Sequence, residues 1–358
     1  MVDVEKTMNR VCAMCGRADA AGLHFCKACG VPLEAAAAPR SEAPPAPSRN
    51  PAPLAALFDD RLALAQGASR GPLGQIADAI SAWVMELDPL HAVARQPEPE
   101  PEPTRSSSAP AWAASWMSSS GEDEYGRWGA ATIQGVVVQF RYCPPGRFVM
   151  GSPESEVGRW ADEGPQHEVT LSRGLWLGEV PVTQRLWEAA VAGYNPSVFK
   201  GEDQPVENLT WHECEAWMAF VSREAESKLR FPTQAEWEYA CRAGTTGATY
   251  RGGNDEATLD AIAWYAENSG GQTHPVKQKA PNPWGLHDML GNVWEWCADS
   301  MRVYTASPVV DPTGGEPTQR VLCGGSWGVD ARSARTAIRY PSAPEGRERR
   351  GFRLARGE

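Results

Sequence analysis

The sequence predicts an irregular, loop-rich domain with a few short helices. Three tryptophans fall within residues 282–296, where they alternate with glycines, asparagines and two carboxylates. Large aromatic side chains next to glycines indicate a backbone held in turns by packing rather than by a regular hydrogen-bond ladder. The 30 prolines and 34 glycines among 358 residues indicate further loops and linkers. A hydrophobic fraction of 42% nevertheless supports a buried core.

Four cysteines near the N-terminus predict a structural zinc ribbon in residues 8–32. Each CxxC pair is followed by a glycine, which is typical of a knuckle that points two thiolates at one metal ion. A segment this short has no core, so the metal would supply most of its folding free energy. The alternative, a redox CxxC motif, normally needs one pair on a larger α/β fold. Zinc ribbons of this size usually serve as docking modules or structural modules. We therefore expect a protein partner, whose identity the sequence does not give. The predicted ligands are Cys12, Cys15, Cys26 and Cys29.

Two linkers flank a short helical segment. Residues 33–53 are rich in proline and alanine, and residues 93–125 are acidic and rich in proline and serine. Alternating proline and glutamate favours an extended spacer. Between the linkers, residues 54–92 carry apolar side chains at a helical period that stops at Pro89. We interpret them either as a helical pair that packs on itself or on the main domain, or as a docking element for a partner helix.

Two capping boxes predict helices in the C-terminal part. Thr210 and Glu213 form the first box, and Thr233 and Glu236 form the second, with Gly244 as the stop signal. Apolar residues then follow the helical period and should face the core. These residues are Cys214, Trp217, Met218, Val221 and Ala225 in the first helix, and Trp237, Ala240 and Cys241 in the second.

Six sequence blocks occur in a fixed order through residues 137–356. They are Phe148-Val-Met-Gly-Ser152, Glu179-Val-Pro-Val-Thr-Gln184 with Trp187, Gln204-Pro-Val-Glu-Asn208, the segments 231–244 and 282–296, and Arg320-Val-Leu-Cys-Gly-Gly-Ser-Trp327 with Gly351-Phe-Arg-Leu-Ala355. In this order they closely resemble the formylglycine-generating enzyme (sulfatase-modifying factor) family. The resemblance implies an irregular α+β fold related to C-type lectins, usually with bound calcium. We assign this domain to residues 126–358.

The same resemblance implies that this chain lacks the reaction centre of the family's enzymes. Enzymes of the family oxidise a substrate cysteine to formylglycine with oxygen, using two cysteines that bind copper(I) after the Gly-Gly-Ser motif. The matching positions here are Val329 or Asp330, and Ala334 or Arg335, and no cysteine follows Cys323. None of these side chains replaces a thiolate as a ligand of copper(I). We therefore expect no copper and no catalytic residue, and interpret the chain as a pseudoenzyme that binds a peptide or protein.

Two enzymatic alternatives stay open. Cys297 and Cys323 form a relocated thiol pair if they lie close together, although single buried cysteines are common in cores. Two thiols within reach of one metal in the cleft would overturn the non-catalytic interpretation. The related iron-dependent sulfoxide synthases use a histidine cluster, but the six histidines here show no HxxxH-type spacing.

The resemblance also implies a calcium site within residues 282–296. In the family, one ion is held there by an Asn or Asp side chain, two backbone carbonyls and a glutamate. Carboxylate and carbonyl oxygens are the ligands that calcium prefers. The alternative is that the two carboxylates only cap turns or pair with arginines. A second family site begins at residues 268–269, but its other ligands cannot be placed. The matching positions here are Asp288, Gly291, Val293 and Glu295.

An arginine-rich segment follows the Gly-Gly-Ser motif and predicts a ligand-binding face. In the active enzymes this region lines the cleft for an extended peptide, and in lectin-like relatives it forms a binding face. The planar guanidinium fork suits carboxylate or phosphate ligands. The alternative is a solvated surface that balances the acidic chain. Arg339 and Arg353 lie within family motifs and are expected in internal salt bridges. The predicted ligand-binding residues are Trp327, Asp330, Arg332 and Arg335.

Composition limits the cellular context. A net charge of −11 argues against general binding to nucleic acids or anionic membranes. No apolar stretch reaches about 18 residues, and the N-terminal residues lack the apolar region of a secretory signal. Nine cysteines without an export signal favour thiols and metal ligands over disulfides. The sequence therefore predicts a cytoplasmic protein of bacterial type.

Overall fold

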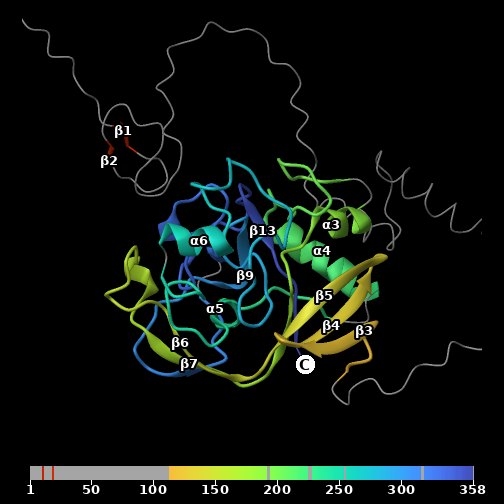
Figure 1. Ribbon diagram of the computed structural model, residues 1–358, viewed down its shortest axis with the longest axis horizontal. Helices are drawn as coiled ribbons and strands as arrows, with labels where there is room; N and C mark the ends of the chain where they lie inside the picture. Colours follow the sequence, from red (N-terminus) through yellow and green to blue (C-terminus); the bar gives the residue numbers. More distant parts are fainter. Residues whose placement is uncertain are drawn as a thin grey trace, which may run out of the picture. The chain divides into compact units, whose positions relative to one another are not determined.

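The computed structural model describes residues 10–11, 18–19 and 113–357 with short gaps (Figure 1). The gaps are residues 192–193, 225–227, 254 and 316–317. The chain divides into two units, residues 1–51 and 52–358. In the first unit, β1 (Arg10–Val11) pairs antiparallel with β2 (Ala18–Asp19). The four cysteines of the predicted zinc ribbon, the linker 33–53 and the segment 54–92 lie outside the described residues.

A five-stranded sheet opens the C-terminal domain. Its strand order is β14-β8-β5-β4-β3. Strands β4 and β5 form a tight hairpin, because Gln134 and Gly135 both adopt positive φ angles between them. The strands are β3 (Ser119–Asp123), β4 (Gly126–Ile133), β5 (Val136–Cys143), β8 (Leu175–Gly178) and β14 (Ala355–Gly357).

The sheet begins earlier than the sequence indicated. Strand β3 lies within residues 93–125, which composition assigned to the acidic linker. It pairs with β4 along its whole length, from Ser119 opposite Ala130 to Asp123 opposite Gly126. Serine, glycine and acidic residues are weak strand formers, so their own propensity gives no signal. The neighbouring strand supplies the hydrogen bonds that place them in the sheet.

Two smaller sheets complete the β structure. One has the order β12-β11-β9-β13, with β13 parallel to β9, and the other has the order β10-β7-β6. Mixed sheets beside a few helices agree with the expected α+β class. The strands are β6 (Gly146–Met150), β7 (His167–Leu171), β9 (Trp294–Ser300), β10 (Val309–Val310), β11 (Arg320–Cys323), β12 (Tyr340–Ser342) and β13 (Arg350–Phe352).

Both predicted capping boxes are confirmed. Thr210 and Glu213 exchange side-chain hydrogen bonds with each other's backbone N–H groups at 3.1 and 2.9 Å, and α4 follows. Thr233 and Glu236 do the same at the start of α5. The helices are α3 (Gln184–Ala190), α4 (Trp211–Glu224), α5 (Gln234–Arg242) and α6 (Glu256–Ile262), with short 3₁₀ turns η1 (Ala161–Glu163) and η2 (Ala331–Ser333).

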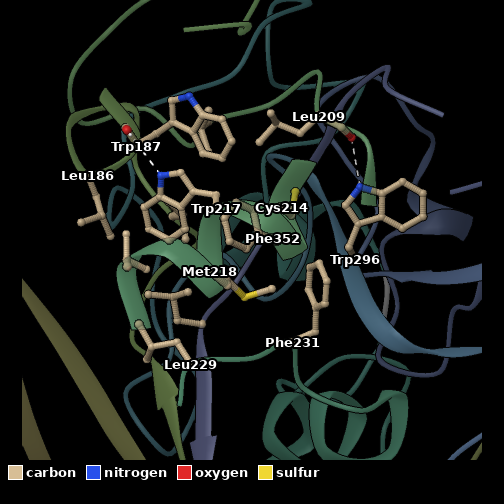
Figure 2. Packing of buried hydrophobic residues seen from close by; sticks show 14 of the residues in the cluster. Leu186, Trp187, Leu209, Cys214, Trp217, Met218, Leu229, Phe231, Trp296 and Phe352 are labelled. Carbon is tan, nitrogen blue, oxygen red and sulfur yellow. Dashed lines mark hydrogen bonds between the residues drawn. The ribbon is translucent and has the colours of Figure 1, made fainter. Parts of the chain in front are cut away.

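The core is built around tryptophans (Figure 2). Trp217 of α4 stacks on Trp187 of α3, with ring centroids 5.6 Å apart, and its indole N–H donates to the Trp187 carbonyl. The indole N–H of Trp296 donates to the Leu209 carbonyl at 3.1 Å. These bonds satisfy the polar edge of each ring inside an apolar cluster. The side chains predicted to face the core are buried, except Ala225, which lies outside the described residues.

The tryptophan-rich run is irregular, as its composition predicts. Residues 282–293 form turns in which Asp288, Gly291 and Asn292 all have positive φ angles, and β9 then begins at Trp294. A Cβ atom at Gly291 would lie 2.2 Å from the Trp264 carbonyl oxygen, so only glycine fits this turn. No helix among the described residues is long and apolar enough to cross a membrane.

Candidate ligand-binding site

A double-glycine turn presents the segment that follows β11. Gly324 and Gly325 have φ angles of +89° and +81°. A Cβ atom at Gly325 would lie 2.5 Å from the carbonyl oxygen of Ser333. The turn therefore requires glycine, and it lets the chain pack against η2 before it leaves the core. Ser326 is fully buried, and the next residue, Trp327, reaches the surface.

Trp327 is half-buried and firmly held. Its ring meets Phe199 edge to face at 5.4 Å, and the guanidinium of Arg349 lies 5.1 Å from its centroid. Its backbone N–H donates to Asn292, and its carbonyl accepts from the Ser269 hydroxyl at 2.7 Å. The ring is thus a fixed aromatic surface with one cation beside it.

Asp330 and Arg332 extend this surface. Both side chains are exposed, and Arg332 lies 5.7 Å from the ring centroid of Trp160. Asp330 accepts a hydrogen bond from the Ser333 hydroxyl at the start of η2. The structure therefore brings three of the four predicted ligand-binding residues, Trp327, Asp330 and Arg332, onto one accessible segment. We call these three residues the aromatic face.

Arg335 is not part of this face, contrary to the expectation. Its side chain is completely buried, and its guanidinium bridges the carboxylates of Glu163 and Glu156. It also donates to the carbonyls of Gly158 and Arg332. A buried charge needs this complete set of partners, so Arg335 holds the loop 152–163 in place. Neighbouring residues could not indicate this role, because the acidic partners of Arg335 lie more than 170 positions away along the chain.

Buried donors without partners lie next to the aromatic face. Among the described residues, the indole N–H groups of Trp160 and Trp327 and the hydroxyl of Ser326 are buried without a hydrogen-bond partner. Such groups normally find an acceptor, and each one left without a partner needs an explanation. Two of them belong to rings that line or border the aromatic face. Trp160 and Phe199 were not predicted as site residues, because neither belongs to a matched motif.

The positions of the family's copper ligands carry no sulfur. Val329 packs against the main apolar cluster, and Ala334 is fully buried in a second one. The alternative matches are the exposed Asp330 and the ion-paired Arg335. None of these side chains offers a soft ligand.

The structure does bring Cys297 and Cys323 together. They lie on the neighbouring strands β9 and β11, with their Sγ atoms 3.7 Å apart. Both are at most 1% exposed and sit in an apolar cluster with Trp237 and Leu290. Burial, and then the contact with Cys323, raise the pKa of the Cys297 thiol well above its usual value. The Cys297 thiol is therefore a protonated group of the core, and neither cysteine is among the residues of the aromatic face. Cys214 and Cys241 are buried in the same way.

The two carboxylates among the predicted calcium ligands, Asp288 and Glu295, accept hydrogen bonds from protein donors. The carboxylate of Glu295 accepts from Trp237 at 2.7 Å and from two nitrogens of Arg353 at 2.8 and 3.0 Å. Asp288 accepts from the Lys277 backbone and the Asn292 side chain. This geometry favours the alternative in which the carboxylates hold turns and pair with arginine. The donor set fits a calcium ion only in part, because a bound ion would lie beside the Arg353 guanidinium.

Arg353 and Arg339 differ in the way they are held. Arg353 forms the expected internal salt bridge with Glu295. Arg339 instead donates to the carbonyls of Asp162 and Arg302 and lies 4.1 Å from the ring centroid of Tyr304. Within the described part of the chain, no cluster of three or more His, Cys, Asp or Glu side chains is arranged to hold a metal ion.

The comparison with solved structures agrees with this architecture. Treponema denticola variable protein 1 superposes with a TM-score of 0.59 and 30% sequence identity. The match covers 64% of this chain and 99% of that one.

Curated relatives include both active and inactive proteins. The chain is 32% identical over 226 residues to the chaperone protein LppX of Paenibacillus barcinonensis, covering 48% of this chain and 75% of that one. It is 39% identical over 140 residues to the formylglycine-generating enzyme of Streptomyces coelicolor, covering 35% and 42%. It is 30% identical over 198 residues to inactive Cα-formylglycine-generating enzyme 2 of Bos taurus, covering 51% and 59%. The chain thus spans about half the length of the two formylglycine-generating relatives.

The family match covers most of the folded domain. Residues 132–358, more than half of the chain, match the sulfatase-modifying factor enzyme 1-like domain. With the fold and the sequence blocks described above, this match shows that the chain belongs to the sulfatase-modifying factor family.

Proposed function

We propose that the C-terminal domain is a non-catalytic module that binds a peptide or protein ligand at the aromatic face. One observation carries the proposal. The segment that holds copper in the family's enzymes here carries no thiol, while Arg335 in that segment is locked between Glu163 and Glu156. Relatives described as a chaperone and as an inactive enzyme support a role without oxidation.

The chemistry of the face suits an extended peptide. Trp327 offers a rigid aromatic surface, and the buried N–H groups of Trp327 and Trp160 lack an acceptor. Carbonyl oxygens of a bound backbone would supply such acceptors. Arg332 and Asp330 add one charge of each sign at the edge. We therefore expect recognition through one apolar contact, backbone carbonyls and a charged side chain, without bond making or breaking.

An assay for the aldehyde product tests the absence of catalysis. The full-length protein is incubated in air with copper and a Cys-x-Pro-x-Arg peptide, with an active formylglycine-generating enzyme as positive control. We expect no aldehyde by mass spectrometry. An aldehyde that is formed by the wild type and lost in Cys297→Ser or Cys323→Ser would overturn the proposal.

A peptide screen tests the binding role. Phage-displayed peptides are selected on the full-length protein and re-tested on Trp327→Ala and Arg332→Gln. We expect the selected peptides to lose roughly tenfold or more in affinity for Trp327→Ala, because an aromatic anchor commonly dominates such interfaces. Arg185→Gln is the matched control, since Arg185 is an exposed arginine paired with Glu202 and Asp203. Equal affinity for all variants would place the ligand elsewhere.

A relocated thiol centre is the second candidate. The 3.7 Å separation of the Cys297 and Cys323 sulfur atoms favours it, because one soft metal ion could reach both. Their complete burial opposes it, since a substrate peptide has no route to the sulfur atoms. Copper(I) titration of the wild type and of the double Cys297→Ser/Cys323→Ser variant distinguishes the two candidates. Tight binding that only the wild type shows would favour the oxidoreductase.

The metal sites remain proposals from the sequence. Four thiolates suit zinc, so we propose one structural zinc per chain at Cys12, Cys15, Cys26 and Cys29, in a module that docks to a protein partner. Metal analysis should find this zinc and lose it in a Cys12→Ser/Cys15→Ser variant. Calcium at Asp288, Gly291, Val293 and Glu295 is tested by the same measurement after exhaustive dialysis against EGTA. The cytoplasmic location is likewise a prediction from the sequence.

A further inference from the structure

A large cavity lies apart from the aromatic face. Its volume is about 820 Å³, and its lining includes residues of α4, the segment 228–236, the end of β14 and the loop after β10. Trp211 and Phe231 form part of its wall and stack on each other with centroids 5.1 Å apart. None of its lining residues belongs to the aromatic face. The proposed function leaves this cavity without a role.

Arg320 gives the cavity a fixed cationic wall. Its guanidinium lies 3.8 Å from the ring centroid of Trp211, and one of its nitrogens donates to the Ala298 carbonyl at 2.7 Å. Its Nε atom is buried without a hydrogen-bond partner, and among the described residues Arg320 forms no ion pair. A flat guanidinium held on an aromatic ring, with unused donors, is suited to a carboxylate ligand.

Seven charged side chains line the cavity: the cations of Arg173, Lys228, Arg230 and Arg320, and the carboxylates of Glu215, Glu236 and Asp311. Together they leave an excess of one positive charge. Arg230 and Glu236 neutralise each other through two contacts of 2.6 and 2.7 Å. Asp311 is held by the backbone and hydroxyl of Ser172. Arg173 and Lys228 are exposed at the rim. A lining with an excess of one positive charge, in a chain of net charge −11, favours an acidic occupant.

The chain contains a segment with matching chemistry. Residues 97–103 read Pro-Glu-Pro-Glu-Pro-Glu-Pro, so they offer three carboxylates on a backbone that favours the polyproline II conformation. Proline-rich segments of this kind dock in grooves lined by aromatic side chains. Trp211 and Phe231 supply the aromatic surface, and Arg320 supplies the cation.

The connection to the domain brings this segment within reach. The described chain resumes at Ala113, and Trp116 packs on Trp176 of β8 and under Arg356 of β14, at 5.7 and 4.0 Å. Gly174, which directly precedes β8, and Gly357, the last residue of β14, line the cavity. Nine residues lie between Pro103 and Ala113, and an extended chain over this interval spans about 33 Å. A tether this short gives a high effective concentration at the cavity.

We propose that residues 97–103 of this chain occupy the cavity, with the carboxylates of Glu98, Glu100 and Glu102 paired to Arg320, Arg173 and Lys228. The proposal is independent of the function proposed for the aromatic face. It assigns a cis ligand to the cavity and a binding role to the acidic linker.

Zero-length cross-linking of the full-length protein tests this assignment. A carbodiimide joins a lysine amine to a carboxylate in contact with it, and mass spectrometry locates the bond. We expect a cross-link between Lys228 and residues 98–102. A mixture of ¹⁵N-labelled and unlabelled protein should give no mixed product if the contact is within one chain. Mixed products that dominate would show that a second copy fills the cavity, and would overturn the proposal.

Variants distinguish docking from mere proximity. Arg320→Gln leaves both cross-linked groups in place, yet the cross-linking rate should fall about fivefold, as expected for the loss of a charge-assisted hydrogen bond. Arg185→Gln, the matched control, should not change it. If Arg320→Gln lowers the melting temperature of the protein, Arg173→Gln replaces it as the cavity variant, because Arg173 is exposed. An unchanged rate in both cavity variants, or no cross-link in the wild type, would overturn the proposal.

Discussion

Arg332 and Arg335 lie three residues apart around η2, yet their surroundings are opposite. Arg332 is exposed beside Trp160, whereas Arg335 is completely buried between Glu163 and Glu156. The two side chains have the same chemistry and the same local sequence context. The difference shows that two arginines of one segment have different surroundings in this chain: Arg335 is held in the fold by buried ion pairs, and Arg332 is exposed to solvent.

Removing the buried arginine is the strongest test of this comparison. Arg335→Ala leaves the carboxylates of Glu156 and Glu163 buried without their cation, so the free energy of unfolding should fall by about 3–5 kcal/mol. Urea denaturation followed by circular dichroism measures this loss. A loss below about 1 kcal/mol would contradict the structural role given to Arg335. Glu163→Gln should lose part of the same free energy, and the double variant should lose less than the sum.

The next largest effect is expected at the double-glycine turn, which precedes both arginines. Gly325→Ala places a Cβ atom 2.5 Å from the Ser333 carbonyl oxygen at a positive φ angle. We expect a loss of about 2 kcal/mol in the free energy of unfolding, from strain and local displacement of η2. Gly135→Ala is the matched control, because its φ angle is also positive but no atom lies within 4 Å of the new Cβ. Equal losses in the two variants would show that backbone strain alone is responsible.

Asp299 is a buried carboxylate that forms no ion pair with any described residue, and it sharpens the contrast with Glu163. Burial raises the pKa of Asp299 to about 6, although its hydrogen bond from the Gln234 backbone opposes the shift. Because the folded pKa exceeds the unfolded value of 3.8, the folded state holds an extra proton between about pH 4 and 6. The contribution of Asp299 to stability is therefore present below this window and is lost as the pH rises through it.

Asp299→Asn should remove this pH dependence. The amide oxygen can still accept from Gln234 but never ionises. Relative to the wild type, the variant should gain about 2 kcal/mol between pH 4 and pH 7. Parallel urea titrations at several pH values measure the difference. Parallel stability curves for the two proteins would mean that Asp299 titrates at its usual value.

The exposed arginine should give the smallest effect on stability. Arg332→Gln should change the free energy of unfolding by less than about 0.5 kcal/mol, because its side chain is exposed and forms no ion pair among the described residues. The same variant is expected to weaken peptide binding at the aromatic face. A loss near that of Arg335→Ala would erase the distinction between the two arginines.

Local signals predicted the elements that they control. Threonine and glutamate at the right spacing started α4 and α5, because each capping box satisfies backbone donors within one turn. The glycines and asparagines of the tryptophan-rich run predicted turns, and Gly291 and Asn292 adopt positive φ angles in those turns. Strand β3 escaped prediction, because its pairing with β4 and not its composition makes it a strand.

The sequence by itself determined the family, the α+β class, the two capped helices and the loss of the copper-binding thiols, because each depends on residue identity or on neighbours along the chain. Only the tertiary structure decided that Arg335 is buried while Arg332 is exposed, that Glu295 pairs with Arg353, and that Cys297 lies 3.7 Å from Cys323. The physical reason is the same in each case. A charge or thiol deep in the protein takes its properties from groups far away in the sequence, and only the folded chain brings those groups together.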